Sequence, residues 1–167
     1  MTSLKFGPPG LVPVTGDWDG DGKDTVGVYD SKTGRFALTN STSGLGPPIE
    51  FSFGAPGLSP IAGDWDGDGK DTVGVYDSKK GAFFLTNLNT DGDASAMFSF
   101  GSPGNKVAVA GDWNGDGKCT VGLYDPTTGT FFLRDSLAAG AADLSTTFGP
   151  PGLMPVAGRW EKANPGA

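Results

Sequence analysis

Apolar residues alternate with polar or small ones over short runs of the chain, and each run closes at Gly, Asp, Asn or Pro. This two-residue period is typical of β-strands, and nothing in the pattern predicts a helix of useful length. Val26 and Val28 point to one side of one run, and Phe36 and Leu38 alternate in the same way in the next. The pattern predicts a half-buried antiparallel meander. Its first four runs are Leu11–Trp18, Thr25–Tyr29, Arg35–Asn40 and Ile49–Phe53.

The meander recurs with a fixed period. The phrase GDWDGDGKDTVGVYDSK fills residues 16 to 32 and again 63 to 79, a looser copy begins at Gly111, and a fourth begins at Gly158 but loses the acidic residues. A period of this length is typical of repeat arrays and propellers. We expect one repeat domain over residues 1–167, with repeats at 6–52, 53–99 and 100–147 and a partial repeat at 148–167. The Phe-Gly pairs that mark the period are 47, 47 and 48 residues apart and begin at Phe6, Phe53, Phe100 and Phe148.

Prolines indicate where the first run of each repeat lies. Pro13, Pro60 and Pro155 fall in this run, and proline is mostly confined to edge strands because it lacks an amide proton. The first run is therefore predicted to be the innermost strand of a propeller blade, where one edge is free. A short strand at Leu4–Phe6 and a last run at Met154–Trp160 complete the expected strands.

The number of units suggests association. Closed propellers typically have about four to eight blades, and this sequence predicts about three and a half. We expect chains to associate, and a dimer that closes a ring of six or seven blades is preferred. The alternative is an open array.

Acidic residues stand at alternate positions in the repeated phrase. Carboxylates this close repel one another without a cation, whereas Ca²⁺ takes about six to eight oxygen ligands from flexible loops. The glycine that follows lets the chain turn sharply, so that later carbonyl groups also face the ion. The sequence therefore predicts calcium-binding loops between the first and second runs. The residues are Asp17, Asp19 and Asp21 with Gly22; Asp64, Asp66 and Asp68 with Gly69; and Asp112, Asn114 and Asp116 with Gly117.

Two other interpretations of these loops fit the sequence less well. An EF-hand needs a glutamate at the twelfth loop position, which here holds Val28, Val75 or Leu123, and a strand follows in place of a helix. The acidic phrase could serve only as a tight turn, but three copies with the same spacing favour the metal site. Asp30, Asp77 and Asp125, which follow the second run, are interpreted as turn caps and not as catalytic acids.

At these residues the sequence resembles the FG-GAP or VCBS-type repeats, which include the calcium-binding blades of integrin alpha-chain propellers. Phe6-Gly7 and its counterparts match the Phe-Gly that gives the family its name, and DWDGDG or DWNGDG matches its acidic loop. The resemblance covers nearly the whole chain and implies four-stranded blades with calcium between strands one and two. It implies side-chain ligands at the acidic positions named above and main-chain ligands at the carbonyls of Lys23, Lys70 and Lys118.

The loops depart from the family at one position. The family usually has an aspartate as the ninth loop residue, where this chain has Thr25, Thr72 or Thr120. An acid occurs one step earlier, at Asp24 and Asp71. Either these acids reach the ion, or threonine hydroxyls or water complete its shell. Cys119 at this place in the third loop is a poor ligand for a hard cation and is expected to be an inert thiol.

The loops therefore differ in expected strength. The third loop should bind most weakly, because Asn114 also removes a charge. The fourth copy, with Arg159 in place of its first acid, should bind nothing. We expect two to three Ca²⁺ ions per chain.

Composition narrows the function classes. Of nineteen acidic residues ten lie in the three loops, and three bound Ca²⁺ ions would bring the net charge from −7 to about −1. The acidic balance argues against nucleic acid as a partner, and no apolar run approaches the ~20 residues of a membrane helix. The chain has no histidine and only one cysteine. An enzyme is therefore not expected, since no carboxylate pair is left once the loops are assigned.

Two non-enzymatic functions remain. The first is a calcium-stabilised structural or adhesion scaffold that binds a cell-surface protein. The second is a lectin with repeated glycan sites, built from Asn40, Asn87, the tyrosines and the tryptophans. The tryptophans occur once per repeat, as Trp18, Trp65, Trp113 and Trp160, which favours packing over sugar stacking. Loops of moderate affinity are filled where calcium is near millimolar, so an extracellular or cell-surface location is expected; a signal peptide is absent from the start of the given sequence.

Overall fold

Each of the three full repeats forms one four-stranded antiparallel sheet. The computed structural model describes residues 5–43 and 46–158, and no helix occurs in these ranges. None of the described residues forms a helix with the length and apolar character that crossing a membrane requires. The expected all-β fold of tandem four-stranded blades is thus confirmed.

The strands follow the predicted runs and pair in chain order within each sheet. The first sheet contains β1 (Val12–Gly16), β2 (Thr25–Asp30), β3 (Arg35–Leu38) and β4 (Ile49–Ser52). The second contains β5 (Ser59–Gly63), β6 (Thr72–Asp77), β7 (Ala82–Leu85) and β8 (Ala96–Ser99). The third contains β9 (Val107–Gly111), β10 (Thr120–Asp125), β11 (Thr130–Leu133) and β12 (Leu144–Thr147).

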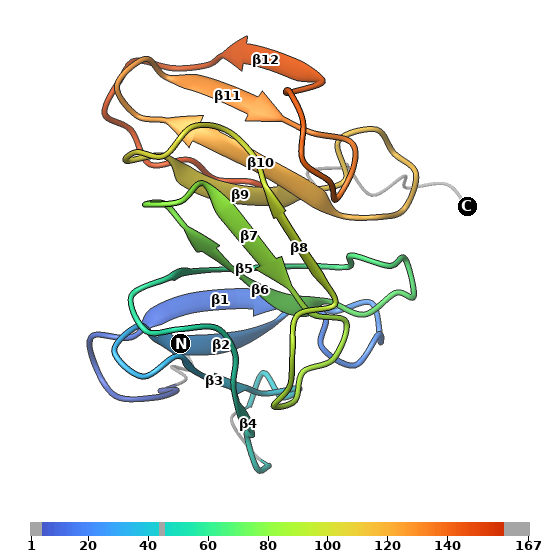
Figure 1. Ribbon diagram of the computed structural model, residues 1–167. Helices are drawn as coiled ribbons and strands as arrows, with labels where there is room; N and C mark the ends of the chain where they lie inside the picture. The colour runs from blue at the N-terminus through green and yellow to red at the C-terminus, as the bar shows by residue number, and fades with distance from the viewer. Residues whose placement is uncertain (1–4, 44–45, 159–167) are drawn as a thin grey trace.

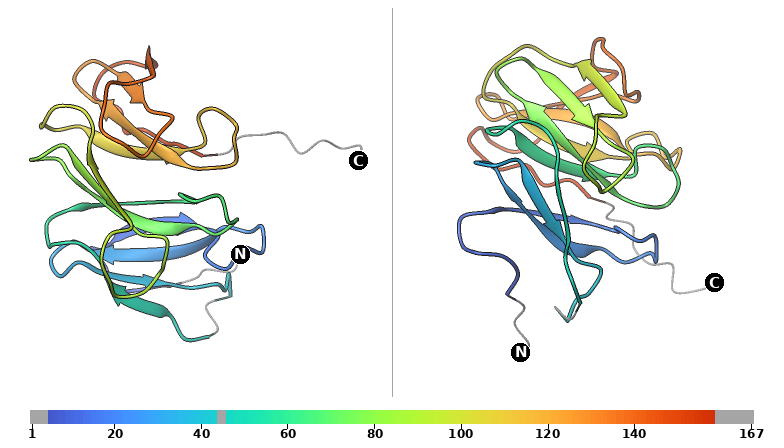
Figure 2. Two further views of the ribbon diagram at one scale, coloured as in Figure 1. Left: turned by 45° about the vertical axis from the view of Figure 1, so that its right-hand side comes forward. Right: turned by 60° about the horizontal axis from the view of Figure 1, so that its bottom comes forward.

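The sheets lie one after another in chain order, with the second between the other two (Figures 1 and 2). Their first strands are neighbours, since β1 contacts β5 and β5 contacts β9. Each first strand is also the edge of its sheet, as Pro13 in β1 and Pro60 in β5 predicted. The described sheets form an open series of blades.

Two hydrophobic cores lie between consecutive sheets. In the first, Tyr29, Phe36 and Leu38 of the first sheet pack against Val73 and Val75 of the second, and each of these five side chains is at most 1% exposed. The second core repeats this arrangement one sheet further along, with Tyr76, Phe83 and Leu85 against Val121 and Leu123. Because each sheet buries aromatic and aliphatic side chains against the next one, the stacking of the sheets is the main source of hydrophobic burial.

The half-buried pattern holds for only one of the three second strands. In β2 the burial alternates, with Val26 exposed and Tyr29 buried. In β6 and β10 both faces are buried, so a half-buried meander was the wrong expectation there. The second sheet is covered on both sides, and one face of the third is covered by the second. The two-residue period of a strand carries no information on a neighbouring sheet, so the sequence pattern did not predict the burial of both faces.

A glycine in each second strand lets side chains of both neighbouring strands meet over it. Gly74 in β6 is paired with Leu85 on one side and Ile61 on the other. A Cβ at Gly74 would lie 2.5 Å from Leu85 Cδ2 and 3.1 Å from Ile61 Cγ1. Gly27 and Gly122 have the same surroundings. The glycine is therefore a packing requirement of the core.

Replacing Gly74 by alanine is expected to destabilise the protein by about 1 to 3 kcal/mol, the usual cost of overpacking a closed core. Urea unfolding followed by tryptophan fluorescence would measure it. Met97→Ala is the matched control, because Met97 lies in the same sheet but is 71% exposed. An equal effect of both substitutions would contradict the tight core around Gly74.

The turns between second and third strands are held by aspartates. Asp30 Oδ1 accepts a hydrogen bond from the Lys32 amide at 2.9 Å, and Asp77 and Asp125 accept from the amides two residues later in the same way. The bond from the Lys32 amide lowers the pKa of the Asp30 carboxyl. The pKa of the Asp125 carboxyl is lowered mainly by the bond from the Thr127 hydroxyl. The prediction that these acids are turn caps is confirmed.

The expected terminal strands do not form among the described residues. Lys5 and Phe6 are outside any strand, and so are Met154 to residue 158. Leu4, Arg159 and Trp160 lie outside the described residues. The physical reason is that a strand needs a hydrogen-bonded neighbour, and no described strand pairs with either segment.

Candidate metal-binding loops

The three acidic loops connect the first and second strands of each sheet, at residues 17–24, 64–71 and 112–119. They lie on the same side of the molecule, one above another (Figure 1). Each loop begins directly after a first strand, which is β1, β5 or β9. The second strand, which is β2, β6 or β10, begins at the residue that follows the eighth loop position. The topology therefore repeats one candidate site at a fixed place in each sheet.

The first acid of the first loop organises its backbone. Asp17 Oδ1 accepts hydrogen bonds from the amides of Gly20 at 2.8 Å and Asp21 at 3.1 Å, and Asp17 Oδ2 accepts one from Gly22 at 2.7 Å. Lys23 donates its amide to Asp21 Oδ1 at 2.9 Å. The loop is thus folded around its own carboxylates.

Two glycines allow this curvature. Gly20 and Gly22 have φ angles of +79° and +83°, a left-handed conformation that side chains strongly disfavour. The second and third loops have glycines with positive φ at the same two positions. Both glycines of the DGDG phrase are therefore structural requirements of the loop.

The turn brings three carboxylates together. One oxygen from each of Asp17, Asp19 and Asp21 can be chosen so that all lie within 4.8 Å of one another. Lys23 Nζ is 2.8 Å from Asp21 Oδ2, and this bond lowers the pKa of the Asp21 carboxyl. Asp19 and Asp21 are exposed. The loop concentrates hard oxygen donors on its outer surface, and these are the ligand type that Ca²⁺ prefers.

The second loop has the same construction. Asp64 accepts the amides of Gly67, Asp68 and Gly69 at 2.7, 3.1 and 2.8 Å. Its three acids, Asp64, Asp66 and Asp68, also gather within 4.8 Å. Because the two loops are identical in sequence, their agreement shows that the local sequence determines the loop conformation.

The third loop keeps the backbone but not the charge. Asp112 accepts the amides of Gly115, Asp116 and Gly117 as its counterparts do. Asn114 replaces the middle acid and donates its side-chain amide to Asp116 Oδ2 at 3.1 Å. One carboxylate is lost and a second is already bound to an amide, so this loop has the weakest oxygen cluster of the three.

The residue at the eighth loop position joins one loop to the preceding one. The Asp71 amide donates to the Asp17 carbonyl at 2.7 Å, and the Asp17 amide donates to Asp71 Oδ2 at 2.9 Å. The Cys119 amide makes the same bond to the Asp64 carbonyl at 2.7 Å. Sequence reasoning considered this position only as a ligand of its own loop. The sequence offers one signal for this contact. Both Asp and Cys occur at the position, which is compatible with a bond made by the main chain.

Burial changes the chemistry of this position. Burial raises the pKa of the Asp71 carboxyl, partly offset by the bond from Asp17, and the acids nearby raise it further. Burial also raises the pKa of the Cys119 thiol. Cys119 is therefore held in its protonated form at neutral pH, in agreement with its interpretation as an inert thiol.

The remaining predicted ligands lie around the loop ends. Thr25, Thr72 and Thr120 are buried at the start of the second strands, and Thr25 Oγ1 and Thr120 Oγ1 each donate to the carbonyl of the first-strand glycine at 3.4 Å. Asp24 is exposed, and so are the residues whose carbonyls were predicted as ligands, Lys23, Lys70 and Lys118. Whether these groups bind an ion stays a prediction.

The tryptophans of the first two sheets are core residues. Trp18 is 5% exposed and Trp65 is 4% exposed, and each belongs to one of the two cores between sheets. Their predicted role in packing is confirmed, and they offer no open face for a sugar. Trp113 in the third sheet is partly exposed, while Asn40 and Asn87 are exposed.

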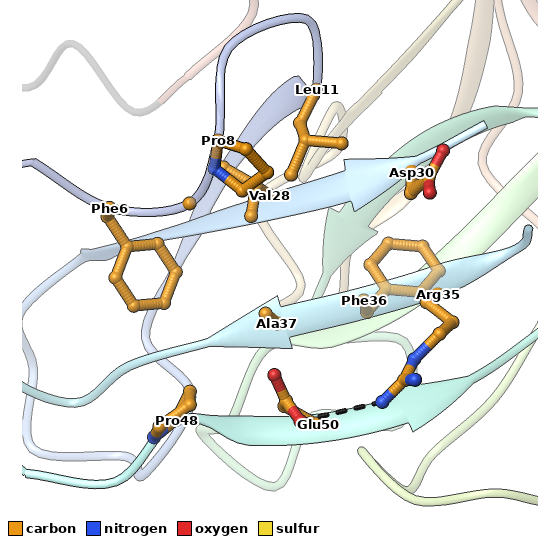
Figure 3. A pocket seen from close by; sticks show the side chains of 11 residues that line it. Phe6, Pro8, Leu11, Val28, Asp30, Arg35, Phe36, Ala37, Pro48 and Glu50 are labelled. Atoms are coloured by element: carbon orange, nitrogen blue, oxygen red, sulfur yellow. Dashed lines mark hydrogen bonds and ion pairs between the residues drawn. The ribbon is translucent and has the colours of Figure 1, made fainter. Parts of the chain in front are cut away.

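Two depressions lie away from the acidic loops. One of about 480 Å³ is lined by residues of all three first strands, including Val12, Pro60 and Ala108, with Ser31, Ser59 and Lys106 as polar groups. The other, of about 270 Å³, lies on the outer side of the first sheet beside Phe6, Leu11 and Val28 (Figure 3). Asp30 and Glu50 both line the smaller depression, and Glu50 forms an ion pair with Arg35 at 3.4 Å.

Comparisons with protein-family models, with curated proteins and with solved structures found no match. The geometry of the loops and the stacking of the sheets are therefore the basis for assigning a function.

Proposed function

We propose that this chain is a non-enzymatic, calcium-binding scaffold built from propeller blades of the FG-GAP or VCBS type. The observation that carries the proposal is the repeated loop in which three aspartate carboxylates lie within 4.8 Å of one another. A tight turn alone requires the first aspartate, which accepts three amides. Asp19 and Asp21 each accept one further amide, but both side chains stay exposed beside the first carboxylate. A bound cation would remove the repulsion among the three charges.

The ligand set follows from the donor atoms. In the first loop Asp17, Asp19 and Asp21 supply carboxylate oxygens and Lys23 its carbonyl; Asp64, Asp66, Asp68 and Lys70 are the counterparts in the second. Asp112, Asn114, Asp116 and Lys118 form a weaker third set. The eighth and ninth positions are less suited, because Asp71 is bound to the preceding loop and Thr25 to Gly16 in the neighbouring strand β1. Water then completes the shell, as is usual for Ca²⁺ in exposed loops.

The scaffold is proposed to act outside the cell or at its surface. Exposed loops with two or three carboxylates suit affinities of about 10⁻⁴ to 10⁻³ M, the range of extracellular calcium modules. The scaffold would bind a cell-surface protein. The chain is also proposed to associate with itself, and a dimer is preferred.

A glycan is the second candidate ligand. It is supported by the depression that gathers the three first strands, where Ser31, Ser59 and Lys106 offer hydrogen-bonding groups around an apolar floor. A glycan array tests this candidate, and the matched variant is Ser59→Val with Ser99→Val as its control. Loss of any glycan signal in the first variant alone would support a lectin; no signal for the unchanged protein would remove this candidate.

Isothermal titration calorimetry tests the calcium sites directly. The unchanged chain is expected to bind two Ca²⁺ ions with similar affinity and a third more weakly. Asp19→Asn and Asp66→Asn should each weaken one of the two stronger sites about tenfold, to the level of the third loop with its Asn114. Each of these acids is exposed and accepts only a 3.3 Å bond from the loop, so the backbone should not change. Asp93→Asn, an exposed acid outside the loops, is the charge-matched control. Equal heats for all four proteins would contradict the assignment.

The third loop allows a gain of binding. Asn114→Asp restores the third carboxylate and removes the amide that binds Asp116. The third site is expected to tighten about tenfold, which corresponds to roughly 1.4 kcal/mol. Unchanged affinity of this site would show that the number of carboxylates does not decide binding.

A further inference from the structure

The two ends of the sheet series carry the two halves of a contact that the chain already makes internally. At the first end, the outer face of β2 presents Val26, which is 36% exposed, and the partly exposed Val28. Their counterparts in the second and third sheets, Val73 and Val75, and Val121 and Leu123, are 0% exposed because the preceding sheet covers them. The first sheet thus has a valine face identical to one that is buried elsewhere in the molecule.

The other half lies at the far end, on the third sheet. The Phe148 amide donates to the Gly129 carbonyl at 3.0 Å, just as Phe53 bonds to Gly34 and Phe100 to Gly81. Phe53 and Phe100 are 3% and 2% exposed, but Phe148 is 79% exposed. The phenylalanine is fixed in the same place in all three repeats, and only the last one has no sheet against it among the described residues.

Two more residues at this end are more exposed than their counterparts in the other repeats. Trp113 is partly exposed where Trp18 and Trp65 are buried, and Leu153, which lies against Gly149 as Leu58 lies against Gly54, is 53% exposed. We define the third-sheet end face by Trp113, Phe131, Phe148 and Leu153. These side chains form an apolar surface of the composition that the internal cores bury.

The first-sheet end face also has the hollow that such a surface fills. The 270 Å³ depression is lined by Phe6, Leu11 and Val28, with the Arg35–Glu50 ion pair at its rim (Figure 3). In the second repeat Phe53, Leu58 and Val75 occupy the equivalent positions, and there they pack against Phe36 and other side chains of the preceding sheet. The depression therefore corresponds to a place that is occupied inside the molecule. Phe53 and Leu58 are the counterparts of Phe148 and Leu153 as well, so in the contact proposed below Phe148 and Leu153 of one copy take the place of Phe6 and Leu11 of the other, which lie outside any strand.

We propose that the third-sheet end face of one chain binds the first-sheet end face of a second copy, head to tail. This deepens the proposed scaffold, since it identifies which surfaces join the copies. A second copy is the occupant because residues 16–32 are identical to residues 63–79, whose sheet is already docked in this way. The contact continues the internal stacking in the same direction. Asp24 of the second copy would then lie beside the loop of Asp112, as Asp71 lies beside Asp17.

This contact is heterologous, because two different faces meet, and it closes into a ring or extends by further copies. That property gives a sharp test with two charge-introducing variants. Val26→Glu blocks the first-sheet end face and Phe148→Glu blocks the third-sheet end face, at positions exposed enough to leave each internal core intact. Met97→Glu, at a residue 71% exposed on β8, controls for an added charge.

Sedimentation velocity at up to about 100 μM protein is the measurement, since it detects contacts with dissociation constants up to about that concentration. The unchanged chain and Met97→Glu are expected to associate. Each end-face variant alone should be monomeric, and an equimolar mixture of the two should form a 1:1 dimer through the one remaining pair of intact faces. Circular dichroism confirms that each variant is folded. A monomeric unchanged chain, association of either variant alone, or no dimer in the mixture would overturn the proposal.

Repeating the measurement in calcium and in chelator separates this inference from the calcium sites. Association of a chain that binds no calcium would support the interface and contradict the calcium proposal. Calcium binding by a chain that stays monomeric would support the calcium proposal and contradict the interface.

Discussion

Removing calcium with a chelator is expected to lower the free energy of unfolding by several kcal/mol and to lower the melting temperature with it. An ion that binds only the folded chain stabilises it by about 2.7 kcal/mol per site when present at about 100 times its dissociation constant. Two strong loops then contribute about 5 kcal/mol, and the third contributes less. Without the ion, the carboxylates that lie within 4.8 Å of one another also repel.

Thermal unfolding in excess calcium and in chelator would measure this difference. The control is a chain that carries both Asp19→Asn and Asp66→Asn, whose melting temperature should respond less to calcium, because every loop then has the weaker donor set of the third loop. The loop backbone should survive these substitutions, since Asp17 and Asp64 keep their hydrogen bonds to the glycine amides. A melting temperature of the unchanged chain that is the same in calcium and in chelator would mean that the loops are turns only.

Replacing Phe83 by alanine is expected to cost about 3 to 5 kcal/mol, the usual range for removing a buried aromatic ring. Phe83 is 0% exposed and lies at the centre of the second core. Its ring centroid is 4.6 Å from that of Tyr76, 5.7 Å from Phe98 and 6.5 Å from Phe100. The substitution removes contacts within one sheet and leaves a cavity against the next one, so both levels of packing are affected.

Phe131 is the matched position in the third sheet. It lies 4.7 Å from Tyr124, as Phe83 lies 4.6 Å from Tyr76, but it is partly exposed. In dilute protein, Phe131→Ala should therefore cost only about 1 to 2 kcal/mol. Chemical denaturation gives both values, and Phe83→Leu provides a folded variant if Phe83→Ala is too unstable to study. Equal losses at the two positions would contradict the stacking of the second sheet on the third.

The repeat and its strands were predictable because both depend on local sequence. The strand positions, the edge strands marked by Pro13 and Pro60, and the aspartate turn caps are read from a few neighbouring residues, and these agree with the structure. The acidic loops are also local, since Asp17 binds amides at most five residues away. Their conformation follows from the DGDG phrase itself.

The features that could not be predicted depend on contacts between sheets. Val26 and Val73 have the same local sequence, yet one is 36% exposed and the other 0%. Asp71 was considered as a ligand of its own loop, but its amide and carboxylate bind Asp17 in the preceding repeat. Met154 begins a segment with the composition of a first strand, and it lies in no strand because no described neighbour pairs with it.

Native mass spectrometry of the chain in calcium and after chelation tests the central claim, a calcium-binding series of stacked blades, most directly. One spectrum reports both the ions bound per chain and the number of chains per particle. The account predicts two or three Ca²⁺ ions on each chain, carried by a discrete assembly of more than one copy. A monomer that binds no calcium would contradict it.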